Sequence, residues 1–279
     1  MTTPVRRGRT LRSRLLAYIT SGVGRLTAAW RILANAQTAL LNSLATIRPG
    51  RSAGTGTRLR AALAAFNTAL AAFNRAAMAF AETWAATDLP LIYREGAWTL
   101  LDNADRRRAT FTWTSRHQGA VTGLSAQYYA DITSRIQEAL RRARVFLRAA
   151  QDAARDTTAR LDVTALRRDH PLDTVVYANN ARHPVASWSR SALTWQAVTT
   201  ANTAAARTAL DELGTEWLEV RDGADCGWTS HDDPDRANRT LRTVQDALAH
   251  PSAHPNCQRE LLPRLDLIGR TEIRSGAPL

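Results

Sequence analysis

Two long runs of apolar residues recur at alternating intervals of four and three, and this spacing constrains the fold more than any other feature. Apolar residues spaced in this way fall on one face of an α-helix, in the pattern of a heptad repeat. The members are Leu26, Trp30, Leu33, the polar Gln37, Leu40, Leu44 and Ile47, then Leu59, Leu63, Phe66, Leu70, Phe73, Ala77, Phe80 and Trp84. The sequence therefore predicts two long helices, about 10–47 and 59–84, packed as an antiparallel hairpin.

The residues between the two runs are typical of a helix break. Pro49 and Gly50 end the first helix, and the stretch to residue 57 contains two more glycines, because proline cannot continue a helix and glycine readily leaves one. In the second run Phe66, Phe73 and Phe80 recur every seven residues. Such a stripe is either a stacking platform for nucleic-acid bases or a buried core, and heptad spacing favours the core.

The positive charge is confined to the first part of the chain. Of the 279 residues, 37 are arginine, none is lysine and 25 are acidic, which gives a formal net charge of +12. Residues 1–81 contain twelve of the arginines and no acidic residue. This excludes a uniformly basic, histone-like chain, and the apolar fraction of 44% excludes a disordered one.

The basic start of the chain predicts an arm that contacts nucleic acid or an acidic protein partner, because arginine pairs with phosphate and carboxylate groups. Its arginines nearest the N-terminus are Arg6, Arg7, Arg9, Arg12 and Arg14. No apolar run approaches the roughly 18 to 20 residues that cross a bilayer, so we expect no transmembrane segment. Two cysteines are too few for a disulfide scaffold, and we expect a reducing compartment.

The middle of the chain alternates helical segments with loops. Asp88, directly before Leu89 and Pro90, is typical of a helix start with its cap. Further helices are predicted at about 118–159 and 187–213, separated by loops around a short apolar piece. Gly214 then provides the residue that a left-handed helix cap favours.

The character of the sequence changes after Gly214. Residues 217–220 alternate as in a half-exposed strand and are followed by a turn-rich segment. We therefore predict a mainly α fold with a small α+β module at the C-terminus. The expected domains are a basic helical hairpin (1–87), a helical body (88–213) and the C-terminal module (214–279).

Both cysteines of the chain cluster with histidines in this last segment. Cys226 and His231 are separated by four residues, and His254 and Cys257 by two. These four side chains offer two sulfur and two nitrogen ligands, which a structural zinc ion accepts in tetrahedral geometry. The spacing departs from the standard finger pattern. The alternative is that the cysteines are small buried hydrophobes and the polar side chains make turn hydrogen bonds.

A wider set of residues in the same region forms a recognisable pattern. Its members are Trp217, Asp222, Cys226, His231, His254, Pro255, Cys257 and Pro263. With the helical lead-in from Ser187, they resemble the C-terminal module of the Mu F-like minor head proteins of tailed bacteriophages, the head morphogenesis family. Members often read Cys-Arg-Cys after His-Pro-Asn, whereas this chain reads Cys257-Gln258-Arg259. The resemblance implies a minor structural protein inside the procapsid, encoded beside the portal, that aids assembly or DNA delivery.

We accordingly expect a non-enzymatic minor capsid protein with no catalytic residues. The expected partners are the portal, scaffold or major capsid protein, and packaged DNA through the N-terminal arm. The expected location is the virion head, with the host cytoplasm during assembly. No cofactor is firmly indicated, and structural zinc is the one candidate.

The alternatives belong to other classes of protein. One is a metal-dependent nuclease of the His-Asn-His type, because His231, Asp232, Asn238 and His254 are the residue kinds that such a site needs. Another is a zinc-containing nucleic-acid-binding protein. Glycine-rich phosphate loops, nucleophile elbows and His-Glu-x-x-His motifs are absent from the sequence, which argues against the common nucleotide-binding, hydrolase and zinc-protease classes.

Overall fold

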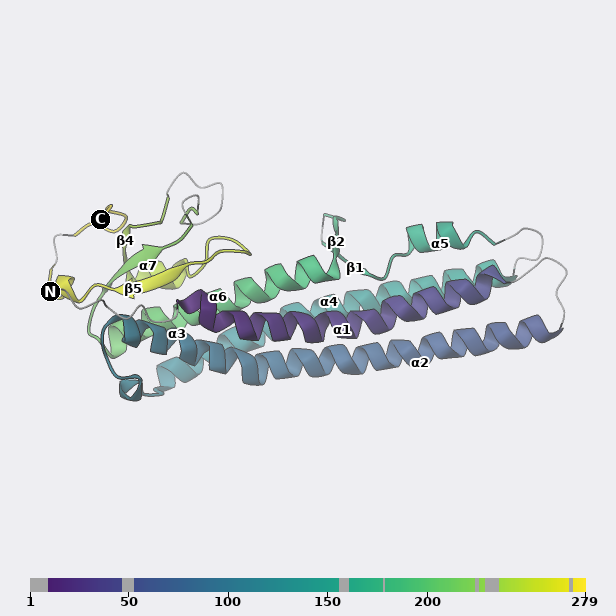
Figure 1. The fold of residues 1–279 in the computed structure, drawn as a ribbon, viewed down its shortest axis with the longest axis horizontal. Coiled ribbons are helices and arrows are strands. Elements are labelled where there is room, and N and C mark those ends of the chain that lie inside the picture. The colour runs from purple at the N-terminus through teal and green to yellow at the C-terminus, as the bar shows by residue number, and fades with distance from the viewer. Residues whose placement is uncertain are drawn as a thin grey trace, which may run out of the picture. The chain divides into compact units, whose positions relative to one another are not determined.

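The computed structural model describes residues 10–46, 53–155, 161–177, 179–223, 226–228, 236–270 and 273–279. The described chain is mainly helical, with two small antiparallel sheets in its C-terminal half (Figure 1). This confirms the predicted fold class. Among the described residues no helix is long and apolar enough to cross a membrane.

The chain forms two compact units that are each assembled from segments distant in the sequence. Unit 1 comprises Met1–Gly22, Thr83–Tyr128 and Arg190–Leu279, and unit 2 comprises Val23–Glu82 and Tyr129–Ser189. The expected domains, 1–87, 88–213 and 214–279, are instead three continuous segments of the chain, and this division stays a prediction.

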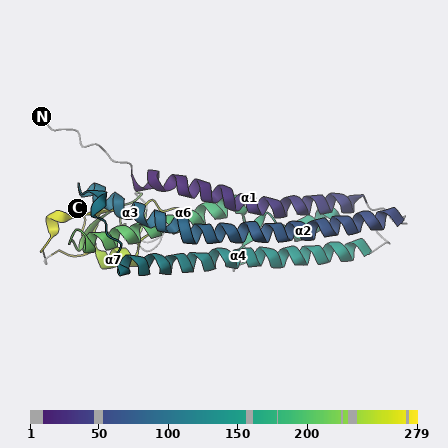
Figure 2. The ribbon, with the colours of Figure 1, turned by 90° about the horizontal axis from the view of Figure 1, so that it is seen from below.

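Helices α1 (Leu11–Ala45) and α2 (Ala53–Thr83) confirm the two predicted long helices. Within unit 2 they run side by side in opposite directions (Figures 1 and 2). The predicted last residue of the first helix, Ile47, lies outside the described residues. The second helix begins earlier than predicted, so Gly54 and Gly56 lie in its first turns and not in the connecting loop.

The aromatic stripe of α2 is part of the core of unit 2. The ring of Phe73 meets Trp30 of α1 edge to face, with centroids 4.9 Å apart. Phe66 contacts Phe146 at 5.4 Å, and Phe80 is also buried. This confirms the core interpretation of the stripe over the stacking platform.

Helix α3 begins directly after Asp88, as predicted, but the predicted capping role of Asp88 is wrong. The φ and ψ angles of Asp88 are −70° and −45°, its side chain makes no capping hydrogen bond, and the chain stays helical. A π-helical turn, η1 (Trp84–Asp88), joins α2 to α3 (Leu89–Asn103), and the Leu89 N–H donates to the Trp84 carbonyl five residues back. Because Pro90 has no N–H and crowds the preceding turn, the helix widens here but does not end.

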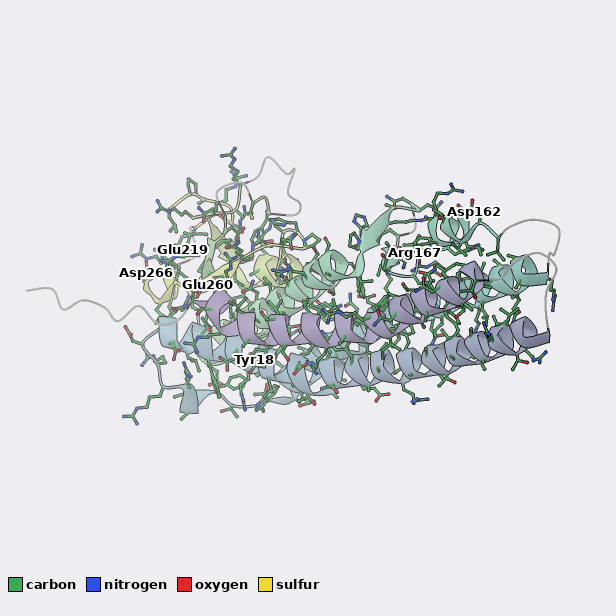
Figure 3. The ribbon with its side chains drawn as sticks, turned by 45° about the vertical axis from the view of Figure 1, so that its right-hand side comes forward. Tyr18, Asp162, Arg167, Glu219, Glu260 and Asp266 are labelled. Atoms are coloured by element: carbon green, nitrogen blue, oxygen red, sulfur yellow. The ribbon has the colours of Figure 1, made fainter. Side chains whose placement is uncertain are left out.

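The third long helix, α4 (Ser115–Arg155), starts close to its predicted position, and residues 156–160 of the prediction lie outside the described residues. A short helix, α5 (Val163–Asp169), follows. Asp162 caps it by accepting hydrogen bonds from two backbone N–H groups at 3.0 and 2.9 Å (Figure 3). Strands β1 (Thr174–Val176) and β2 (Arg182–Pro184) then pair antiparallel, where the sequence predicted a short apolar piece between loops.

Helix α6 (Val185–Asp211) confirms the last predicted long helix, and Gly214 has the expected positive φ of 64°. The C-terminal module that follows is built on a three-stranded antiparallel sheet in the order β4-β3-β5. Its elements are β3 (Trp217–Arg221), β4 (Leu241–Thr243), α7 (Val244–Ala249) and β5 (Glu260–Pro263), and the chain also has 3₁₀ turns η2 (Arg108–Thr110) and η3 (Leu265–Leu267). The strand predicted at 217–220 is thus confirmed. Its Leu218 and Val220 are buried in a cluster with Ala205 and Ala209 of α6.

Candidate metal centre

The pairing of β3 with β5 brings the two cysteines together. In this antiparallel pair, Arg221 at the end of β3 lies opposite Glu260 at the start of β5. The segment that leaves β3 and the segment that enters β5 therefore lie at the same edge of the sheet. Cys226 is on the first segment, and His254 and Cys257 are on the second, 28 or more residues later.

The ligand atoms of Cys226, His254 and Cys257 all lie within 4.8 Å of one another. In a tetrahedral zinc site, bond lengths of about 2.3 Å to sulfur and 2.0 Å to nitrogen place neighbouring ligand atoms roughly 3.5 to 3.8 Å apart. The described spacing fits such a site with small side-chain adjustments. The three residues can therefore hold a metal ion.

The three side chains also contact one another directly. The Sγ atom of Cys226 lies 3.2 Å from Nε2 of His254, whose Nδ1 accepts a hydrogen bond from the Asn256 backbone N–H at 3.3 Å. The proton of a neutral imidazole then lies on Nε2, facing the sulfur. A metal ion bound at Nε2 would require the neutral imidazole to carry its proton on Nδ1, so the hydrogen bond from Asn256 would be lost when the metal binds.

The environment of the sulfur atoms disfavours charge in the absence of a cation. Burial raises the pKa of Cys226 to about 11, and the neighbouring Cys257 and the Asp222 carboxylate act in the same direction. Both cysteines are buried with Ala253 in a small cluster. A bound metal ion would reverse this effect, since a cation next to a thiol favours the thiolate.

A buried ion pair lies beside the candidate metal centre. The Nη2 atom of Arg259 is 2.7 Å from Oδ2 of Asp222, and both side chains are 0% exposed. The Nε atom of Arg259 lies 3.1 Å from Oδ1 of the same carboxylate, so the pair is bidentate. Asp222 was among the pattern residues, whereas Arg259 was not singled out. Nothing in the sequence pattern distinguished Arg259 from the other arginines of the chain.

The other pattern residues lie in the same module. Trp217 is buried in β3, and Pro263 in β5 is paired with Leu218. Pro255 is exposed in the turn in which the Cys257 N–H donates to the His254 carbonyl at 2.9 Å. The predicted fourth ligand, His231, lies outside the described residues.

Two of the residues considered for a nuclease, Asn238 and His254, lie in the described part of the chain. Asn238 accepts a hydrogen bond from the Asp222 backbone N–H at 2.9 Å, and His254 faces Cys226. His231 and Asp232 lie outside the described residues. Each described candidate thus makes a contact that holds the module together.

Two of the five arm arginines belong to the described chain. Arg12 donates to the side chain of Gln258, and Arg14 donates to Asp102 and lies 3.6 Å from Glu95. The Arg14 side chain is 10% exposed, so its charge is used within unit 1. Arg6, Arg7 and Arg9 lie outside the described residues, and their role in contacting an anionic partner stays a prediction.

Comparisons of the chain with known protein families, with curated proteins and with solved structures find no match.

Proposed function

We propose that the chain is a non-enzymatic minor capsid protein of the Mu F-like head morphogenesis type, acting in procapsid assembly near the portal. The observation that carries the proposal is that the described pattern residues, from Trp217 to Pro263, gather in one small module. There the polar members make contacts within the module: His254 lies against Cys226, and Asp222 binds Arg259, which is not one of the pattern residues. This use of conspicuous polar residues favours a structural role over catalysis.

The proposed cofactor is one structural zinc ion. Cys226, His254 and Cys257 would hold it, and His231 is the proposed fourth ligand because structural zinc sites are usually closed by four protein ligands. Two thiolates and imidazole nitrogen form a donor set that suits zinc better than calcium or magnesium, which favour oxygen. When bound, the ion would neutralise the thiolates and hold the two ligand-bearing segments together.

The proposed partners are the portal, scaffold or major capsid protein, with packaged DNA as a further contact of the basic helices. The proposed location is the interior of the procapsid, after synthesis in the host cytoplasm. Charge supports this assignment, because residues 1–81 contain twelve arginines and no acidic residue, and such a stretch attracts a polyanion or an acidic protein surface.

The proposal is tested by assembling heads with and without the zinc ligands. The chain is coexpressed with the portal, scaffold and major capsid proteins of the same genome, and purified procapsids are assayed for the chain and for zinc. We expect the unmodified chain to be incorporated with about one zinc per copy, and Cys257→Ser to lose the zinc and be incorporated less.

The matched control is Arg270→Ser, an exposed substitution in the same module. It should leave incorporation and zinc content unchanged. Procapsids that exclude the unmodified chain would contradict the proposal, and so would metal-dependent cleavage of plasmid DNA by the purified protein.

A further inference from the structure

The two ligand-bearing segments of the C-terminal module must be held together, either by a bound metal ion or by contacts of the protein itself. Its ligands come from two segments that are separate in the sequence, and the buried cluster around them contains only Cys226, Ala253 and Cys257 among the described residues. In many small metal-binding modules the ion itself supplies the free energy of folding, and the apo form is unfolded. The contacts of Arg259 point to a different arrangement.

The guanidinium of Arg259 binds groups on every segment that carries a ligand. It is bidentate to Asp222, which lies four residues before Cys226. Its Nη2 atom donates to the carbonyl of Gly227, next to Cys226, at 2.8 Å. Its Nη1 atom donates to the carbonyl of His250, four residues before His254, at 2.6 Å. Arg259 itself follows Cys257 by two residues.

The surroundings allow this ion pair to stabilise the module. A buried pair repays its loss of hydration only when its geometry is good and its remaining hydrogen-bonding groups are satisfied. Here the Asp222 carboxylate accepts hydrogen bonds from both Nε and Nη2 of Arg259. The carbonyl groups of His250 and Gly227 accept further hydrogen bonds from the guanidinium. The Cζ atom of the guanidinium also lies over the ring of Trp228, 4.6 Å from its centroid. Lysine offers neither the fork nor the stacking.

We propose that the Asp222–Arg259 ion pair closes the C-terminal module without metal, so that Cys226, His254 and Cys257 form a preformed site that a metal ion enters and leaves while the fold persists. Asp222 and Arg259 are positioning residues for this site. The metal part of the inference rests on the zinc proposed above, whereas the closure of the module does not. A preformed site binds more tightly, because the ordering of its segments does not oppose binding.

The first experiment needs no substitution. The full chain is stripped of metal with a chelator, and hydrogen exchange is followed by mass spectrometry in peptides covering 217–228 and 254–264, with and without added zinc. We expect both peptides to stay protected in the metal-free protein. Loss of their protection on stripping, with recovery on zinc addition, overturns the proposal, because metal would then be closing the module.

The second experiment compares two ion pairs of the same module. Arg259→Lys and Asp222→Asn weaken the buried pair, and Arg264→Lys and Asp266→Asn are the matched controls, since Arg264 and Asp266 form a pair at 2.8 Å in which Asp266 is 60% exposed (Figure 3). Zinc affinity is measured by competition with a chromophoric chelator. We expect it to fall about 10- to 100-fold in the first two variants, as for other partners that orient metal ligands, and to stay unchanged in the controls.

Excess zinc should restore exchange protection to Arg259→Lys, because ligand binding stabilises the folded form by mass action. Protection of peptides from α4 reports whether the rest of the variant has folded. Unchanged zinc affinity in both Arg259→Lys and Asp222→Asn overturns the proposal.

If the unmodified chain takes up no zinc, the zinc proposal fails but the closure remains testable. Metal-free Arg259→Lys should then lose protection in 217–228 and 254–264, while Arg264→Lys keeps it. If these two peptides of metal-free Arg259→Lys keep their protection from hydrogen exchange, the proposal is overturned, whether or not the unmodified chain binds zinc.

Discussion

Single buried polar residues take their partners from neighbouring helices, and His117 of α4 is an example. Its side chain is 0% exposed, with Nε2 lying 3.7 Å from Asp211 at the end of α6. Its Nδ1 lies 2.9 Å from the Tyr93 hydroxyl of α3. Burial raises the pKa of Tyr93, so the hydroxyl keeps its proton and donates it to Nδ1. Burial also lowers the pKa of His117, although Asp211 and Glu212 oppose the shift.

This arrangement predicts that acid destabilises the fold through His117. Since the folded protein holds the pKa below the ordinary value of 6.5, the unfolded chain binds the proton more readily. The free energy of unfolding should be unaffected above that value and should decrease as the pH falls through it toward the lower folded-state pKa. Urea unfolding at about pH 7.5 and 5.5 measures the loss.

The comparison variant is His117→Gln, whose side-chain oxygen still accepts from Tyr93 but does not titrate. Its loss of stability between the two pH values should be smaller than that of the unmodified protein. The charged groups facing this position are Asp211, Glu212 and Arg207, and all three are retained in the variant. Equal losses in the two proteins would contradict the assignment to His117.

Residue chemistry alone indicated part of the candidate metal centre. Cys226, His254 and Cys257 stood out because cysteine and histidine are scarce in the chain and crowd into one segment. Arg259 did not stand out among 37 arginines. Its role depends on burial, and burial follows from the pairing of β3 with β5, which sequence spacing does not specify.

At the scale of elements, one close approach within unit 1 depends on a glycine. A Cβ atom at Gly96 of α3 would lie 2.0 Å from the backbone carbonyl oxygen of Ala201 in α6. Backbone atoms cannot move aside as the end of a side chain can. The two helices therefore approach each other at a distance that only glycine allows at this position.

We predict that Gly96→Ala destabilises the protein by about 1 to 3 kcal/mol, the usual cost of forcing an extra methyl group into a packed core. The control is Gly119→Ala in α4, where a Cβ atom meets nothing within 4 Å. It should stabilise by up to about 1 kcal/mol, because alanine is the better helix former. Thermal and urea unfolding of both variants give the comparison. Similar effects of the two substitutions would show that α3 and α6 are not in close contact.

The long helices were the most predictable elements, because heptad spacing over many turns is a strong signal, and α1, α2, α4 and α6 all lie near their expected positions. The continuation of the helix through Asp88 was missed. Proline after a capping residue usually marks a helix start. Here Pro90 widens the turn, and Trp84 at its beginning is buried and donates to Gln196 at 2.8 Å.

At the scale of the whole molecule, net charge is the property most relevant to a partner. Helix α1 carries arginine and no acidic residue, and α2 has one acidic residue, at its C-terminal end. Arg14 of α1 is paired with Asp102 and Glu95. In α4 and α5 exposed arginines also have carboxylates close by: Arg141, Arg155 and Arg168 lie 3.1, 3.3 and 3.0 Å from acidic side chains. Attraction of a polyanion should therefore be concentrated on the first two helices.

We predict sequence-independent DNA binding that weakens with salt and depends on the exposed arginines Arg31, Arg58 and Arg75. Replacing all three with glutamine should lower the slope of log affinity against log salt by up to about 3, or about 1 for each lost phosphate contact. The control replaces Arg141, Arg155 and Arg168 with glutamine, the same change in net charge. Fluorescence anisotropy over a salt series measures both, and equal slopes in the two variants would contradict the prediction.

The π-helical turn between α2 and α3 also affects how the chain can change over evolution. Up to Trp84 the stripe follows intervals of three or four. Ala85 is also buried, and the next buried residue after it is Leu89, which lies five residues after Trp84. One residue is in effect inserted into an otherwise regular helix. Loss of any one residue here would restore an ordinary α-helix and turn every later side chain of α3 by about 100°. We therefore expect relatives to tolerate substitution in this turn but not a change in its length.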